Sequence, residues 1–288
     1  MQNSEELVQL NIQHYSYRQD LDSLLNIVNT ISFSEFETIL CKLLQSQDRE
    51  IVSNTCFTIR DLIVCYSNRY DEFAEFGKRY PESLIVKTLE SLLFSKNRYT
   101  VLDAIYTLGK TCSYSSIPAL NKAFYHLKDI DPFILSRLFC EMIWLGLENF
   151  WELIYSMISS ENEFTRWAAV QEFPAFIEKD GEEKSVLLDE KYKYLERLKQ
   201  DSNKFIRIQA EHRCRMIEFQ TVKEELSKKE QNKRRKELEK EYDSILNFET
   251  LSRIFQNYLS YKKLNNYTLT QLQDFFDYYI FFTGFYRI

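Results

Sequence analysis

Glycine and proline are scarce in this chain, with five glycines and four prolines among 288 residues. That is about 3% of the chain, whereas the two together average roughly 12% of protein sequences. β-Sheet folds need many tight turns, and these two residues supply much of the turn chemistry. We therefore exclude sandwiches, barrels and propellers. The glycines also lie far from one another, which excludes the ordinary glycine-rich nucleotide-binding loops.

Apolar residues recur with the period of an α-helix along most of the chain. Ser34 followed by Glu37 predicts a capping box at the start of one helix. Three prolines (Pro81, Pro118 and Pro132) each precede a helical pattern, as suits the first turn of a helix. The predicted helices cover 36–44, 51–66, 82–94, 119–127 and 133–145, and similar helices follow to about residue 220.

A five-residue frame recurs, in which a large apolar residue is followed by a small one. The pairs are Ile51/Cys56, Tyr99/Ala104, Phe164/Ala169 and Phe205/Ala210, with a weaker copy at Phe133/Leu138. A small side chain lets a partner helix approach closely. The copies are spaced by about the length of one helical hairpin with its loops, which predicts stacked hairpin repeats.

Two segments resemble HEAT repeats, including the short bacterial HEAT-like type found in phycobilisome lyases. They read NRYTVLDAIYTLGKTCSYSSIPALNKAF (97–124) and DSNKFIRIQAEHRC (201–214). The family pattern has a loop acid, an arginine six residues later and an alanine three residues after that. The matching residues are Asp201, Arg207 and Ala210, and then Arg166 and Ala169 in the preceding copy, where Ser160 replaces the acid. The resemblance covers roughly 30–215.

The pattern and the resemblance together imply an all-α, right-handed α-solenoid of HEAT-like helical hairpins with a C-terminal helical extension. Each hairpin has an apolar face that only its neighbours can cover. We expect the solenoid over 1–217, a charged helix or linker over 218–243, and an aromatic-rich helical cap over 244–288.

The charge of the chain is uneven. Residues 1–187 hold 17 Lys/Arg against 27 Asp/Glu, a net charge of −10, whereas the remainder has a net charge of +4. Affinity for DNA depends mainly on neutralising phosphates, so an acidic body disfavours nucleic acid as a partner. It suits a basic protein instead.

The leading hypothesis is a non-enzymatic protein-binding scaffold or adaptor, such as a toxin-neutralising or assembly factor. Its acidic concave groove would be lined by the second helices of the hairpins, at 82–94, 118–128, 149–158 and 186–199. Glu148 and Glu152 are i,i+4 neighbours if one helix holds both. Trp167 has polar neighbours in sequence, which favours a ligand-facing position. The candidate partner-binding residues are Glu82, Glu90, Glu148, Glu152 and Trp167.

Catalytic and metal-binding patterns are weak. Adjacent helical residues point about 100° apart, so Glu211 would not orient His212, which we expect to be a surface or groove side chain. Cys56 fits a core position, whereas Cys112 is the best candidate for an exposed thiol. No pair of cysteines has the spacing of a zinc site. We therefore predict no catalytic residue, cofactor, metal or small-molecule substrate.

The first ten residues, MQNSEELVQL, have no apolar stretch, and no segment offers eighteen consecutive apolar residues. These features predict no signal peptide, no contact with a membrane, and a cytoplasmic protein whose thiols are reduced.

Two alternatives stay open. The bacterial HEAT-like resemblance implies a bilin-chromophore lyase or chaperone, with Arg166 and Arg207 for the propionates and Trp167 for the rings. The other alternative is nucleic-acid binding, along the mixed basic and aromatic residues of 189–215.

Overall fold

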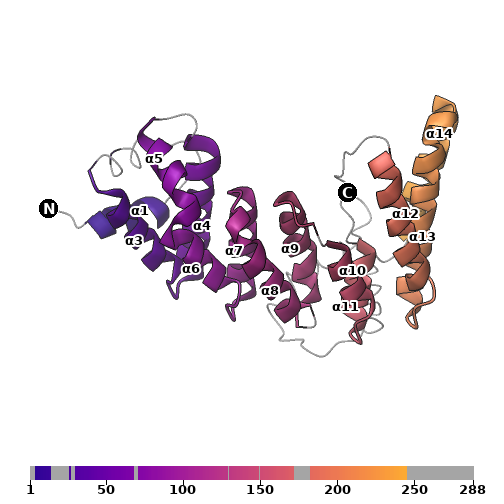
Figure 1. Ribbon diagram of the computed structural model, residues 1–288, viewed down its shortest axis with the longest axis horizontal. Helices are drawn as coiled ribbons and strands as arrows, with labels where there is room; N and C mark the ends of the chain where they lie inside the picture. Colours follow the sequence, from indigo (N-terminus) through magenta and orange to yellow (C-terminus); the bar gives the residue numbers. More distant parts are fainter. Residues whose placement is uncertain are drawn as a thin grey trace, which may run out of the picture. The chain divides into compact units, whose positions relative to one another are not determined.

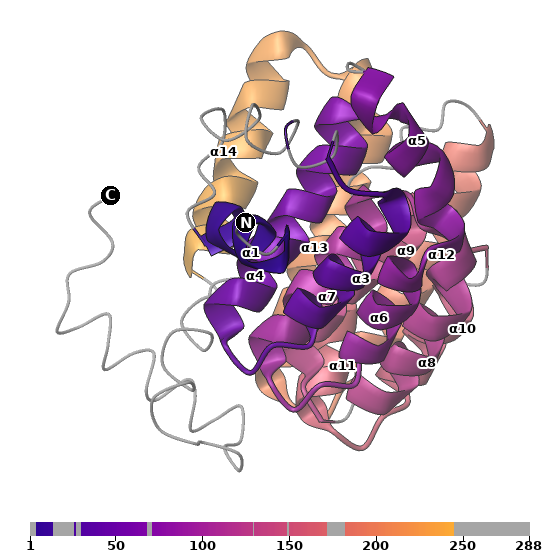
Figure 2. The same cartoon turned by 90° about the vertical axis from the view of Figure 1, so that its left-hand side faces the viewer.

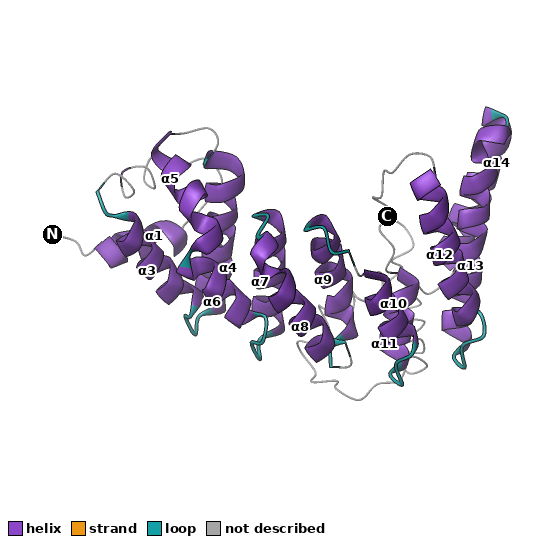
Figure 3. Ribbon diagram, viewed as in Figure 1, coloured by secondary structure: helices purple, strands orange, loops and turns teal. Residues whose placement is uncertain are grey.

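The computed structural model of the protein describes residues 4–13, 26, 30–67, 71–128, 130–148, 150–171 and 182–244. All regular structure within these ranges is helical, which confirms the all-α prediction (Figure 3). No helix in the described ranges is both long and apolar enough to cross a membrane. The predicted cap over 244–288 lies, apart from its first residue, outside the described residues.

The chain divides into two compact units, and the division passes through one helix. Unit 1 comprises residues 1–127 and 137–148, and unit 2 comprises residues 128–136 and 149–288. The helices of unit 1 are α1 (Ser4–Gln13), α3 (Phe33–Leu44), α4 (Arg49–Arg60), a π-helical turn η1 (Asp61–Tyr66), α5 (Asp71–Arg79), η2 (Tyr80–Glu82), α6 (Leu84–Leu92), α7 (Arg98–Lys110), η3 (Tyr114–Ser116), α8 (Ile117–Leu127) and most of α9 (Pro132–Trp144). Those of unit 2 are α10 (Phe150–Ile158), α11 (Glu163–Gln171), α12 (Glu182–Leu198), α13 (Lys204–Val222), η4 (Lys223–Glu225) and α14 (Lys228–Ser244).

Each unit is a stack of helical hairpins in two layers. In unit 1, α3 packs on α4 and α6 on α7, while α3 also packs on α6 and α4 on α7 (Figures 1 and 2). In unit 2, the pairs α10/α11 and α12/α13 stack in the same manner. Because each hairpin covers the apolar face of the next, the fold is an all-α solenoid of repeats.

A short polar turn precedes each of four helices, α4, α7, α11 and α13, and repeats the same bonds. Asn97 accepts a hydrogen bond from the backbone N–H of Tyr99 at 3.0 Å, and Ser95 accepts one from the N–H of Asn97 at 3.1 Å. The equivalent pairs are Ser46/Asp48, Ser160/Asn162 and Asp201/Asn203. Each turn therefore satisfies N–H groups that a helix start would leave unbonded.

These caps correct the repeat register in its first copy. Asp48 caps Glu50, just as Asn97 caps Tyr99, so the small-residue position falls on Thr55 and not on Cys56. Thr55 is fully buried, and its hydroxyl donates to the carbonyl of Ile51 at 2.6 Å. The one-residue error arose because Cys56 is equally small and equally buried.

The other residues at the second position of the frame, three alanines and a leucine, lie in the core. Ala104, Leu138, Ala169 and Ala210 have no exposed surface. They stand on the sides of α7, α9, α11 and α13 that face other helices, where a short side chain permits close packing.

The predicted capping box at Ser34 is wrong. Helix α3 is capped by Ser32, which has an extended backbone and accepts from the N–H of Glu35. Glu37 instead accepts a hydrogen bond from the backbone N–H of Leu84, at 2.6 Å, and thereby caps α6 of the next hairpin. A side chain expected to act within its own helix thus joins two repeats.

Candidate functional site

Unit 1 carries a row of cations and aromatic rings along one face of three successive helices, which we name the cation–aromatic strip. Helical spacings of three, four, seven and eight residues bring its members to the same side of each helix. Its residues are Arg49, Phe57 and Arg60 on α4, Tyr99, Tyr106 and Lys110 on α7, and Arg137 and Trp144 on α9.

Tyr106 is the centre of the strip. The guanidinium carbons of Arg60 and Arg137 lie 4.6 Å and 3.9 Å from the centroid of its ring. Lys110 lies 5.5 Å from the Tyr106 ring and 5.5 Å from the Trp144 ring. Contacts of this length are attractive cation–π interactions. Side chains from three helices therefore hold one another in fixed positions.

The outer members of the strip are accessible to a partner. The Trp144 side chain is 60% exposed, and Phe57 is 38% exposed. Arg49 is exposed and lies 4.2 Å above the ring of Tyr99. An exposed tryptophan held beside fixed cations has the composition of a protein-binding hot spot.

Two carboxylates lie beneath the strip. Glu141 is fully buried, 2.9 Å from the guanidinium of Arg137, and neither of its oxygens has a hydrogen bond of good geometry in the structure. Asp103 on α7 also has one buried carboxylate oxygen without a hydrogen bond of good geometry. These acids counter the charge of the arginines from the interior while the cations face outward.

Burial has the largest effect on the pKa of both acids. It raises the pKa of Glu141, an effect that the charges of Arg137, Lys110 and Arg60 partly offset. It also raises the pKa of Asp103, which a hydrogen bond from Ser53 and the charge of Arg60 partly offset. The neighbouring cations therefore favour the ionised form of both carboxylates and oppose the effect of burial.

The acidic residues predicted from the sequence have different surroundings. Glu82 is exposed in η2, and Glu152 is exposed in the first turn of α10. Glu90 accepts a hydrogen bond from Ser116 at 2.8 Å and pairs with Lys87 at 3.2 Å, so it holds α6 to η3. Glu148 is exposed in the turn before α10, outside that helix, so the i,i+4 relation expected with Glu152 is absent.

Trp167 faces the core. It has no exposed surface, and its indole N–H donates to the side-chain oxygen of Gln209 on α13. The expectation that Trp167 faces a ligand is therefore corrected: its side chain is buried in the core and does not line an open groove. Trp144, a tryptophan that the sequence analysis did not select, is 60% exposed.

His212 is also more buried than predicted. Only 2% of it is exposed, and burial lowers the pKa of its imidazole. Its ring packs edge-on against that of Tyr242 on α14, with centroids 5.5 Å apart.

The predictions for the two thiols are confirmed: Cys56 is buried and Cys112 is exposed.

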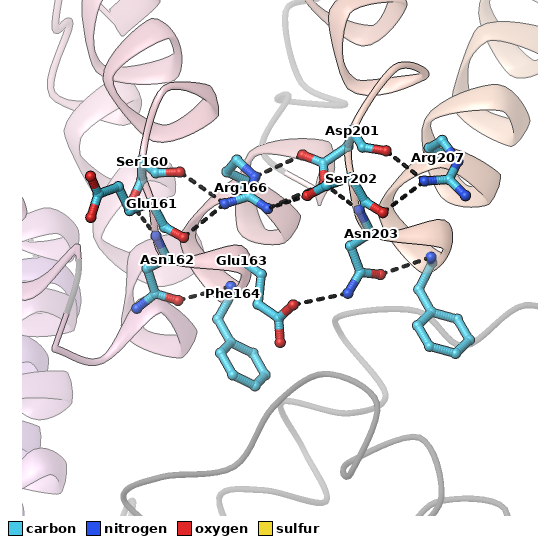
Figure 4. Close-up of polar contacts among 11 residues, drawn as sticks. Ser160, Glu161, Asn162, Glu163, Phe164, Arg166, Asp201, Ser202, Asn203 and Arg207 are labelled. Carbon is cyan, nitrogen blue, oxygen red and sulfur yellow. Dashed lines mark hydrogen bonds and ion pairs between the residues drawn. The ribbon is translucent and has the colours of Figure 1, made fainter.

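Arg166 and Arg207 repeat one arrangement in unit 2 (Figure 4). Each points its guanidinium back at the turn before its own helix: Arg166 donates to the carbonyls of Ser160 and Glu161, and Arg207 to the equivalent carbonyls six and five residues before it. Arg166 also pairs with Asp201 at 2.7 Å. The cations that the bilin hypothesis assigned to propionates therefore bind protein groups.

Sequence reasoning missed the strip, although a signal for it exists. Counting from Asn97 and Asp131, the residues directly before α7 and α9, Lys110 and Trp144 occupy the same repeat position. Aligning the copies by these two positions would have placed both side chains on one face of neighbouring helices.

No group of three or more potential metal ligands occurs within the described residues.

Comparison with known proteins adds little to this geometry. No family model matches the sequence, and no curated protein matches it. One similar solved structure is an engineered protein, 14% identical, with 76% of this chain and 97% of that chain aligned and a TM-score of 0.34. Another is a designed armadillo repeat protein in complex with the peptide (KR)4, 14% identical, with 71% and 96% aligned and a TM-score of 0.35.

Proposed function

We propose that this chain is a non-enzymatic protein-binding scaffold and that the cation–aromatic strip is its binding surface. The observation that carries the proposal is Trp144, 60% exposed and held beside Lys110 on a face whose other members are fixed by stacking. Tryptophan, tyrosine and arginine dominate hot spots because they offer large contact areas and strong polar groups. Side chains already fixed in the free protein lose little entropy on binding.

The repeat type that we propose is HEAT-like. The contact of Arg166 with Asp201 supports it, since it joins the loop acid of one repeat to the arginine of the preceding one. The basic partner inferred from net charge, with contacts at Glu82, Glu148 and Glu152, stays a prediction, as does the cytoplasmic location.

Photo-crosslinking tests the position of the surface. A benzoylphenylalanine at position 144 would be compared with one at position 125, because Tyr125 is similarly exposed at 50% but belongs to α8 in the other helix layer. We expect one partner from the native host to crosslink at 144 and not at 125. The same partner should be lost from pulldowns with Trp144→Ala and kept with Tyr125→Ala.

A reversed result would move the binding surface to the layer of α6 and α8 and would restore the acidic contacts predicted from the sequence. Crosslinking at neither position would exclude both layers of unit 1.

A further inference from the structure

We infer that the partner segment received by the cation–aromatic strip is acidic, an inference that rests on the binding surface proposed above. The strip presents Arg49, Arg60, Lys110 and Arg137 together, on a chain whose overall charge is −6. The local charge is thus opposite to that of the whole protein. Charge complementarity at the contact, and not the net charge, selects the bound group.

Burial of the acids makes the strip more positive toward solvent than a simple count suggests. Glu141 has no exposed surface, and Gly109 and the Arg137 guanidinium lie against it. The Arg137 side chain, by contrast, keeps 39% of its surface exposed. The compensating negative charge therefore lies inside, and the positive charge lies outside.

The stacked guanidiniums can receive an anion only at their edges, because the Tyr106 ring occupies the flat faces of Arg60 and Arg137. One nitrogen of Arg60 contacts the Thr107 hydroxyl at 3.4 Å and one of Arg137 lies 2.9 Å from Glu141, and the other N–H groups of each guanidinium can donate to a carboxylate. Arg60 also lies over the ring of Phe57, at 5.2 Å from its centroid. An arginine in contact with two rings loses little side-chain freedom when an anion binds.

The same stacking disfavours single-stranded nucleic acid as the occupant. Sequence-tolerant binding of bases needs aromatic faces that are open for stacking. The ring of Tyr106 already carries two guanidiniums, and that of Tyr99 carries Arg49. Trp144 remains as an apolar contact for a residue beside the acids of the bound segment.

The repeat spacing fits an extended peptide. Neighbouring helices pack about 8–10 Å apart, and alternate residues of an extended chain are about 7 Å apart on one side. Acids at every second position would therefore reach cations on successive helices. We expect the natural segment to alternate acidic residues with small or apolar ones.

The test is a titration of the full-length protein with a rhodamine-labelled peptide of alternating Glu and Ser, followed by anisotropy at low ionic strength. The test variant is Arg49→Gln with Lys110→Gln, whose residues are exposed members of the strip. The matched control is Lys87→Gln with Lys122→Gln, which removes the same charge from exposed residues of α6 and α8. We expect the test variant to bind about tenfold more weakly and the control to stay within about twofold of the wild type.

Three results would overturn the inference. The first is tighter binding of a Lys–Ser peptide, which favours the basic partner. The second is tighter binding of a single-stranded oligothymidylate that competes with the peptide, which favours nucleic acid. The third is equal loss of affinity in both variants. If crosslinking at position 144 persists in any of these cases, the strip remains the binding surface and only its charge preference is wrong.

Discussion

The guanidinium of Arg166 on α11 forms a two-point ion pair with the carboxylate of Asp201, in the turn that opens α13. Its remaining N–H groups bind the carbonyls of Ser160 and Glu161, so one side chain fastens the turns of two repeats. The pair is largely shielded from water, with 15% of the Arg166 side chain and 5% of the Asp201 side chain exposed. A contact of this kind fixes the spacing of neighbouring hairpins in unit 2.

Replacing Arg166 with alanine should lower the free energy of unfolding by about 2–3 kcal/mol, because the Asp201 carboxylate is left poorly solvated and without its cation. Arg207→Ala is the matched control. Arg207 makes the same bonds to its own turn, and its loss should cost only about 1 kcal/mol. Urea unfolding followed by circular dichroism measures both, and equal losses would show that the ion pair contributes nothing of its own.

Gly109→Ala should destabilise unit 1 through a clash with Glu141. A Cβ at position 109 would lie 2.6 Å from the Cβ of Glu141, closer than side chains tolerate. The strain should cost about 1–3 kcal/mol, more than the roughly 1 kcal/mol that alanine gains over glycine as a helix former.

A double-mutant cycle with Glu141→Gly identifies the cause. Removing the whole Glu141 side chain, its Cβ included, should recover most of the loss, so that the two changes are strongly non-additive. Additive losses would place the strain elsewhere.

The buried carboxyl group of Glu141 also makes the stability of the fold depend on pH. Burial raises the pKa of Glu141 above its ordinary value of 4.5, so the folded protein holds this proton at a higher pH than the unfolded chain does. The contribution of Glu141 to stability therefore falls as pH rises from about 4.5 through the raised value, and is constant above it. Glutamine at this position does not titrate.

Glu141→Gln should accordingly gain stability relative to the wild type as pH rises through that window. Arg137→Gln should do the opposite, since it removes the nearest cation and leaves the carboxylate less compensated. Urea unfolding at several pH values measures both differences. A pH-independent difference for Glu141→Gln would mean that the folded and unfolded pKa values are equal.

Much of the fold could be predicted locally. Proline at the starts of α8 and α9, the apolar period and small residues such as Ala104 and Ala210 depend on neighbours a few positions away, and these features emerged correctly. Pro81 did not, since it lies in η2 and α6 begins only after Ser83. The strip did not, because Tyr106 and Arg137 meet only once the packing of α7 against α9 is known. The basic partner predicted from net charge rests on an average over residues on every face.

Trp167 shows the same limit. Polar neighbours in sequence suggested exposure, but adjacent residues on a helix point to different sides. Its burial is decided by Gln209, which is 42 residues away and supplies the acceptor that an indole N–H needs in a core.

The two tryptophans should therefore respond differently to replacement by phenylalanine. Trp167→Phe leaves the buried Gln209 oxygen without its donor and should cost about 1–3 kcal/mol. Trp144→Phe should change stability by less than about 0.5 kcal/mol, as for ordinary surface positions. Unfolding curves and acrylamide quenching check this, since Trp144→Phe should remove the more quenchable part of the emission. A large stability loss in Trp144→Phe would contradict its surface position.

The ends of α7 and α9 share one backbone geometry but not one residue. The second residue after each end has a positive φ, 52° at Cys112 and 79° at Gly146. The following N–H bonds back to the carbonyl five residues earlier in both copies, from Ser113 to Leu108 at 3.1 Å and from Leu147 to Met142 at 3.0 Å. Glycine adopts this conformation without strain, whereas the Cβ of cysteine crowds the backbone.

Cys112→Gly should therefore stabilise the protein by about 0.5–1 kcal/mol, because it relieves that crowding at the end of α7. The control is Cys112→Ala, which removes the thiol but keeps the Cβ and should bring no gain. Thermal unfolding of the three proteins under reducing conditions measures the difference. Because Cys112 is exposed, loss of its thiol changes little in the core. If Cys112→Ala gains as much stability as Cys112→Gly, the thiol and not the positive φ is the source of the instability.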